Sequence, residues 1–176
     1  TAYLSVASKA AGFAAILRVF YVAFGELGAD WSMLFAALSV LSMFVGNLVA
    51  IAQSNIKRML AYSTVAQAGY ILIGVAAVAS AVPGQETLGP SSVLFYLVSY
   101  AATNLAAFFA IIVIANRSGS ESIDSFAGMG RRSPLVAAVL AFAMLSLIGI
   151  PPTAGFMGKL YIFSAAIKGD LVWLAI

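Results

Sequence analysis

The amino-acid sequence is dominated by long apolar segments, and these leave few choices of fold. A helix needs about 20 residues to cross the roughly 30 Å hydrocarbon core of a bilayer. Segments of that length occupy residues 2–24, 31–53, 58–80 and 92–115. In lipid every backbone N–H and C=O group must be paired within the protein, which helices achieve and open sheets do not. The sequence therefore predicts an all-α, polytopic transmembrane helix bundle.

A fifth apolar segment, residues 134–167, is too long for one straight crossing, because it would span about 51 Å at 1.5 Å per residue. Its middle carries Gly149-Ile150-Pro151-Pro152-Thr153-Ala154-Gly155, and glycine and proline break helices. Broken backbone at membrane depth is expected only where protein or water surrounds it. We therefore expect a discontinuous helix, broken at 149–155, beside a buried ion path. A partial sixth helix is expected at 170–176.

The composition agrees with a membrane protein and narrows its chemistry. Hydrophobic residues make up 63% of the chain, charged residues 9%, and the mean hydropathy is +1.06. The chain contains no cysteine and no histidine, so we expect no usual zinc site, no haem ligation through these residues and no redox site. We expect one transmembrane domain over residues 1–176. Because no charged leader precedes Thr1 and Ile176 ends an apolar segment, we interpret the chain as a fragment of a longer protein.

The basic residues gather on one side of the predicted bundle. Lys57 and Arg58 share that side with the loop 116–133, which carries Arg117, Arg131 and Arg132. The opposite connections, residues 25–30 and 82–90 and the turn at Lys168, contain one basic residue against these five. By the positive-inside rule the basic side is predicted to be cytoplasmic. This topology explains the net charge of +3 without nucleic acid as a partner.

Two lysines are the strongest candidates for function. Lys159 follows the break by a few residues, where the positive end of a half-helix and burial both disfavour its ammonium form. Such a lysine can take up and release a proton, whereas the alternative is a lysine that snorkels to the interface. Lys9 lies on the first helix and is either a buried proton carrier or an interfacial anchor.

Polar side chains on other predicted helices can support a proton path. Ser63, Gln67 and Tyr70 fall on one helix face, and Asn104 lies on the segment 92–115. These groups can hold water for proton hopping, or simply form hydrogen bonds between helices. Interfacial or structural roles are expected for Arg18, Lys57 and Arg58. No acidic residue falls in the middle of a predicted helix, and no metal or cofactor motif occurs.

Three segments of the sequence resemble one known family, in the same order along the chain. They are Ser8-Lys9, the stretch 46–64 continued by Gln67-Ala68-Gly69-Tyr70, and the run 147–159. They resemble the antiporter-like membrane subunits of respiratory complex I, and most of all its subunit N, or chain 2, branch. The resemblance implies an inverted-repeat fold, in which this chain begins at helix eight and ends at the start of helix thirteen.

The same resemblance implies a function. The chain would belong to the proton-translocating part of NADH-quinone oxidoreductase, with Lys9 as the central-axis lysine and Lys159 as the lysine of the terminal half-channel. As a subunit of a translocase it would bind no cofactor itself; NADH or ferredoxin, flavin, iron–sulfur clusters and quinone would belong to partner membrane and peripheral subunits. Some relatives carry histidine in place of Gln67, so a relay here would use lysine, hydroxyl, amide and water.

Two alternatives remain open from the sequence. The chain can belong to a multisubunit cation/proton antiporter without redox partners, or it can be a non-conducting scaffold. Iron–sulfur and quinone-binding subunits should accompany only the complex I subunit, and lysines that face lipid would favour the scaffold. The expected location is a prokaryotic plasma membrane, with an organelle inner membrane or a thylakoid membrane as alternatives.

Overall fold

The computed structural model describes residues 2–24, 28–79 and 88–175 of the 176-residue chain. Within these residues the chain is helical: α1 (Ala2–Arg18), a π-helical turn η1 (Val19–Ala23), α2 (Gly28–Ile51), α3 (Ile56–Ala79), α4 (Leu88–Ser118), a 3-10 turn η3 (Ile123–Phe126), α5 (Met129–Arg132), α6 (Pro134–Ile148), α7 (Ala154–Lys168) and α8 (Val172–Ala175). Four of the described helices are long and apolar enough to cross a membrane. The predicted all-α bundle with a discontinuous helix is confirmed.

Several helix boundaries differ from those expected from the sequence. α4 begins at Leu88 instead of residue 92, because Pro90 lies in its first turn, where the missing N–H costs no hydrogen bond. The predicted loop 116–133 contains the end of α4, together with η3 and α5. The partial helix expected at 170–176 is the short helix α8. Ser80, Ile176, Glu26 and Glu86 lie outside the described residues.

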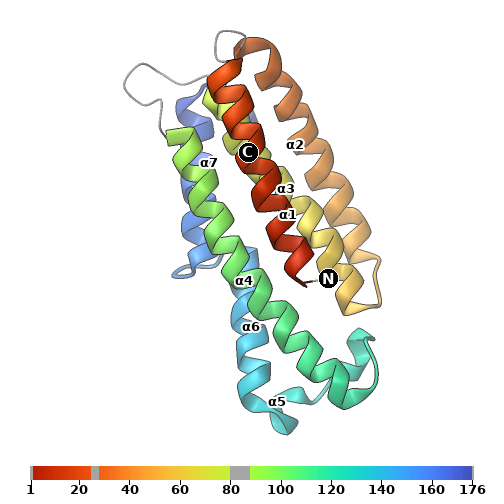
Figure 1. Ribbon diagram of the computed structural model, residues 1–176. Helices are drawn as coiled ribbons and strands as arrows, with labels where there is room; N and C mark the ends of the chain where they lie inside the picture. The colour runs from red at the N-terminus through yellow and green to blue at the C-terminus, as the bar shows by residue number, and fades with distance from the viewer. Residues whose placement is uncertain (1, 25–27, 80–87, 176) are drawn as a thin grey trace.

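α2 and α3 form the closest pair in the bundle (Figure 1). A Cβ atom on Gly46 would lie 2.6 Å from the backbone nitrogen of Ala66, so only glycine permits this approach. The hydroxyl of Ser39 also donates to the carbonyl of Gly69 at 2.8 Å. Small residues and short interhelical hydrogen bonds therefore hold the pair together, as is usual for helices in a membrane.

α4 connects the remaining helices and, together with α6, extends beyond α1, α2 and α3 on one side (Figure 1). Its 31 residues correspond to about 46 Å. α4 packs against α1, α3, α6 and α7. Around its first half lies the larger core cluster, with Ile71, Tyr96 and Ile162 almost fully buried. A second cluster, which includes Leu60 and Phe108, surrounds its second half.

The discontinuous helix consists of α6 and α7, which have 15 residues each, or about 22 Å. Neither half alone crosses the hydrocarbon core. α6 ends at Gly149, whose φ of +93° is the left-handed conformation typical of a helix-ending glycine. α7 is capped at its start by Thr153, whose side-chain oxygen accepts from the N–H of Phe156. The intervening Pro151–Pro152 peptide bond is cis.

The two half-helices touch at their joint. The hydroxyl of Ser146 on α6 accepts a hydrogen bond from the N–H of Gly155 on α7 at 3.2 Å. A Cβ atom on Gly155 would lie only 1.8 Å from the carbonyl oxygen of Ser146. Glycine is therefore required at this position for α6 and α7 to meet.

A contact on the basic side ties the turn between α2 and α3 to the segment after α4. Lys57 pairs with Glu121 at 2.5 Å, and the side-chain amide of Asn55 donates to the same carboxylate at 3.1 Å. Backbone hydrogen bonds reinforce this contact: the N–H of Ile56 donates to the carbonyl of Glu121, and that of Ile123 to the carbonyl of Ser54. The hydrogen bond from Lys57, followed by that from Asn55, lowers the pKa of Glu121.

Candidate functional site: the joint of the discontinuous helix

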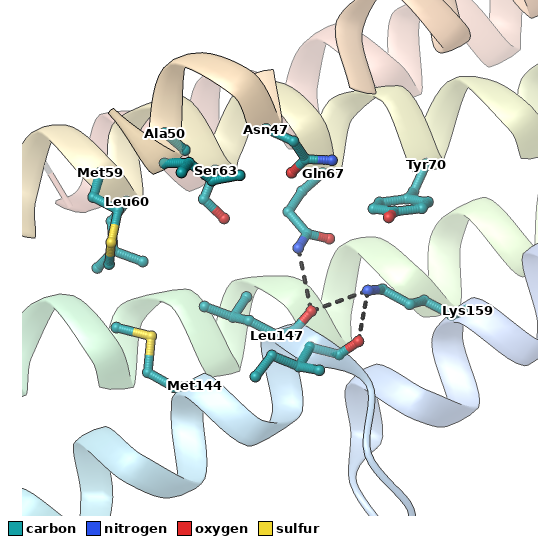
Figure 2. Close-up of a pocket in the computed structure, with 12 residues that line it drawn as sticks. Asn47, Ala50, Met59, Leu60, Ser63, Gln67, Tyr70, Met144, Leu147 and Lys159 are labelled. Atoms are coloured by element: carbon teal, nitrogen blue, oxygen red, sulfur yellow. Dashed lines mark hydrogen bonds between the residues drawn. The ribbon is translucent and has the colours of Figure 1, made fainter. Parts of the chain in front are cut away.

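Lys159 lies at the joint between α6 and α7. Its ammonium donates to the carbonyl oxygens of Leu147 at 3.1 Å and Ile148 at 2.9 Å, as Figure 2 shows. In a continuous helix these two carbonyls would accept from residues 151 and 152, but both positions are proline and have no N–H. The lysine therefore satisfies two acceptors that the prolines leave without a backbone donor.

The surroundings of Lys159 add electrostatic contacts that the sequence does not show. Its Nζ atom lies 4.5 Å from the ring centroid of Tyr70, within the range of a cation–π interaction. Lys159 is the sixth residue of α7 and thus lies beyond its first turn, where the effect of the positive helix end is weak. In the structure the carbonyl end of α6, which carries partial negative charge, faces the same ammonium. The carbonyl end of α6 is therefore the half-helix end that acts most directly on Lys159.

Gln67, on α3, is buried and joins the same cluster. Its Nε2 donates to the carbonyl of Leu147 at 3.3 Å, so this oxygen accepts from both Gln67 and Lys159 (Figure 2). Its Oε1 accepts a hydrogen bond from the hydroxyl of Tyr96 on α4. The amide of Gln67 therefore connects the end of α6 with a buried tyrosine.

Two tyrosines of α4 continue from Gln67 into the bundle, and the sequence reasoning missed both. Tyr96 and Tyr100 are 3% and 4% exposed, and their rings are stacked with an interplanar angle of 6° and centroids 6.5 Å apart. Their spacing of four residues, which places them on one helix face, is the signal that could have identified them. The hydroxyl of Tyr100 is buried near the side chain of Thr64, but it forms no hydrogen bond of ordinary geometry among the residues that the structure describes.

Lys9 points into the bundle. It shares a face of α1 with Phe13 and Leu17, which are both buried. Its Nζ donates to the carbonyl of Thr64 on α3 and lies 5.8 Å from the ring centroid of Tyr100. Lys9 and Lys159 therefore lie at opposite ends of a cluster that also contains Tyr100, Tyr96 and Gln67.

A cavity of about 400 Å³ lies beside Lys159 (Figure 2). It extends along α3 from Met59, near the basic end of that helix, to Tyr70. The polar residues that line it are Asn47, Ser63, Gln67, Tyr70 and Lys159; the apolar ones are Ala50, Ile51, Met59, Leu60, Met144, Leu147 and Ile148. The structure thus places Ser63, Gln67, Tyr70 and Lys159 around one space.

Other residues singled out from the sequence lie elsewhere. Asn104 is buried on α4 but does not line this cavity. Arg18 is exposed at the end of α1, and Arg58 is exposed at the basic end of α3. Lys57 forms an ion pair with Glu121. In the described part of the chain, no group of three or more acidic side chains is placed to hold a metal ion.

Comparison with known proteins gives consistent matches over the whole chain. A family model described as "NADH:quinone oxidoreductase/Mrp antiporter, TM" matches residues 1–176. The chain is 51% identical over 176 residues to a protein named NADH-quinone oxidoreductase subunit N from Moorella thermoacetica, and 50% identical over 186 residues to one of the same name from Chlorobium chlorochromatii. All of this chain is covered, but only 36% and 35% of these relatives. The chain thus spans about a third of their length.

Solved structures support the same relationship. The Mrp complex from Dietzia sp. DQ12-45-1b contains a chain that is similar with a TM-score of 0.82 and 31% identity, covering 93% of this chain and 29% of the other. The archaeal membrane-bound sulfane sulfur reductase gives a TM-score of 0.73 and 28% identity, over 84% of this chain and 29% of the other.

Proposed function

Because this chain belongs to the NADH:quinone oxidoreductase/Mrp antiporter transmembrane family, we propose that it is part of a proton-translocating membrane subunit of an NADH-quinone oxidoreductase. About 50% identity to proteins named NADH-quinone oxidoreductase subunit N supports this choice within the family. Electron transfer from NADH, or ferredoxin, through flavin and iron–sulfur clusters to quinone would take place in partner subunits. The subunit would reside in a prokaryotic plasma membrane.

The observation that carries this proposal is the pair of inward-pointing lysines at opposite ends of one buried polar cluster. Lys9 and Lys159 each take up and release a proton, and Ser63, Gln67 and Tyr70 support the polar path between and beside them. A change of charge on one lysine alters the proton affinity of the other through the low-dielectric interior. Redox events in the partner subunits can thus drive the lysines without a moving substrate.

The first test is Lys159→Ala in the complete complex, with Lys168→Ala as its matched control. Lys168 lies on the same helix, but it is exposed in the last turn. We expect Lys159→Ala to reduce proton translocation per NADH oxidised by about tenfold or more, because a positioned proton-transfer group typically contributes 10²- to 10⁴-fold. Subunit content of the purified complex should remain near that of the native one. Normal pumping by an assembled Lys159→Ala complex would contradict the proposal.

A cation/proton antiporter subunit without redox partners is the second candidate, and the similarity to the Mrp complex favours it. Affinity purification of the full-length subunit distinguishes the two. An NADH-quinone oxidoreductase subunit should bring with it flavin- and iron–sulfur-containing subunits, whereas an antiporter subunit should not. If pumping were normal in both Lys9→Ala and Lys159→Ala complexes, the lysines would be structural and a scaffold role would remain.

A further inference from the structure

We propose that Gln67 and Tyr96 form a positioning pair that transmits the charge state of Lys159 toward Lys9; this inference rests on the proposed function. Gln67 is the central residue of this connection, because its amide contacts both Tyr96 and the end of α6. Its oxygen accepts from Tyr96 and its nitrogen donates to the carbonyl of Leu147. A carboxamide has no proton to give up at ordinary pH and keeps its donor and acceptor ends distinct. Gln67 therefore orients its neighbours and does not itself carry the proton.

The carbonyl of Leu147 is where the pair meets the lysine. It accepts from the ammonium of Lys159 at 3.1 Å and from the amide of Gln67 at 3.3 Å. A hydrogen bond from an ionised donor is roughly twice as strong as one between neutral groups. When Lys159 gives up its proton, its hydrogen bond to the carbonyl of Leu147 weakens. Gln67 then becomes the stronger of the two donors to this carbonyl. The charge on Lys159 thus determines how firmly Gln67 is held against α6.

The ring of Tyr96 is held in place, so a change in the position of Gln67 acts on the Tyr96 hydroxyl. A Cβ atom on Gly158 would lie 2.7 Å from the Cδ2 atom of Tyr96, so the ring lies directly on the backbone of α7. With the ring held between α4 and α7, the hydroxyl is the part that can reorient. It donates to Gln67 on one side, and the ring stacks on Tyr100 on the other.

Tyr100 completes the link to Lys9. Its ring lies 5.8 Å from the Nζ of Lys9, and its buried hydroxyl lies near the side chain of Thr64 without a hydrogen bond of ordinary geometry in the described residues. Such a group is costly unless another polar group reaches it. Because the Tyr96 ring is held, a reorientation of its hydroxyl changes the electrostatic surroundings of the stacked Tyr100 ring and of the lysine beside that ring. The two lysines are thereby coupled through side-chain orientation as well as through charge.

The test uses two variants that delete only the hydrogen bonds, made in the complete complex. Tyr96→Phe keeps the ring and removes the hydroxyl, and Gln67→Met keeps a similar volume but has no donor and only a weak acceptor. We expect each to lower proton translocation per NADH by about three- to tenfold. The double variant should be no worse than the single ones, because residues that act as a unit are not additive. Tyr161→Phe, an exposed tyrosine of α7, is the matched control and should pump normally.

A second substitution at Gln67 distinguishes a positioning role of its hydrogen bonds from a role in packing alone. Gln67→His offers one donor and one acceptor nitrogen and should restore at least about half of the pumping lost in Gln67→Met. The inference is overturned if Tyr96→Phe pumps normally, if the two losses add, or if Gln67→His pumps no better than Gln67→Met. Should Gln67→Met fail to assemble, Tyr96→Phe alone decides. Loss of pumping in Lys159→Ala with normal pumping in Tyr96→Phe would refute only the pair, whereas normal pumping in Lys159→Ala would refute the proposed function itself.

Discussion

At the scale of single residues, the joint depends on how prolines and a lysine complement each other. Pro151 and Pro152 remove two backbone donors, and Lys159 supplies two side-chain donors to the carbonyls left behind. The cost of breaking a helix within the membrane is thereby reduced, while an ionisable group gains a fixed position. The same residues that interrupt the helix therefore hold the lysine in place.

A substitution at Gly149 tests whether the position of the Lys159 side chain matters for proton translocation. Its φ is +93°, and a Cβ atom there would lie 3.1 Å from the Cδ of Lys159. Gly149→Ala should therefore lower proton translocation by about tenfold, since a small misplacement of a catalytic group can cost up to 10²-fold. Gly119→Ala is the matched control, because its φ is +71° and nothing lies within 4 Å. Both variants pay about 1–2 kcal/mol for a left-handed alanine, so equal pumping would show that the contact with Lys159 is unimportant.

The sequence revealed the lysines of the site more readily than their connections. Lys9 and Lys159 stand out because charge is rare in apolar segments. Tyr96 does not, because a tyrosine on an apolar helix serves packing equally well, and only the packing of α4 against α3 and α7 shows that its hydroxyl reaches Gln67. The acceptors of Lys159 were equally hidden, because they are backbone groups of another helix.

At the scale of elements, the contact between Lys57 and Glu121 links two connections that are far apart in the sequence. The hydrogen bonds from Lys57 and Asn55 lower the pKa of Glu121 below its ordinary 4.5. A carboxyl group whose pKa is lower in the folded state stabilises the fold fully above its unfolded pKa, and this contribution disappears as the pH falls through the folded pKa. The contact should thus be complete at neutral pH and lost in acid.

Hydrogen exchange of residues 119–126 in the solubilised complex measures this effect. Protection factors, corrected for intrinsic exchange rates, should fall by about two- to fivefold between neutral pH and the range below 4.5, as expected for a half-exposed ion pair. Glu121→Gln should already show the lower protection at neutral pH. Asp124→Asn, which changes an exposed carboxylate of η3, should behave like the native protein. If Glu121→Gln retained the native pH dependence, another group would be responsible.

Element boundaries were predictable where composition changes sharply and less so elsewhere. The discontinuous helix follows from its length and from the Gly-Pro run. The loop predicted at 116–133 proved partly helical, because α4 continues to Ser118 after its apolar stretch ends. The bridge between Asn55 and Ser122 joins residues whose proximity depends on how α3 and α4 pack. Such contacts depend on tertiary structure and leave no local pattern.

At the scale of the whole molecule, the distribution of charge defines two sides. The end of the bundle that contains α5 carries Lys57, Arg58, Arg131 and Arg132, whereas Lys168 is the last residue of α7 at the other end (Figure 1). Because the cytoplasmic side carries the excess of basic residues, α1 should run outward from the cytoplasm.

Single cysteines test this orientation directly, because the described chain has none of its own. In sealed vesicles with the cytoplasmic face outward, Arg131→Cys should react with a membrane-impermeant maleimide and Lys168→Cys should not. Both residues are exposed. In vesicles of the opposite orientation the pattern should reverse. Labelling of both from the same face would show that the bundle is placed incorrectly in the membrane.

The contact of Gly155 with Ser146 also has a consequence for evolution. Every single-nucleotide change of a glycine codon that alters the residue introduces a side chain with a Cβ atom or ends translation, and there is no room for that atom between α6 and α7. No single-nucleotide change that alters residue 155 therefore leaves the contact between α6 and α7 intact. A lineage cannot change the residue at position 155 without first separating the two half-helices.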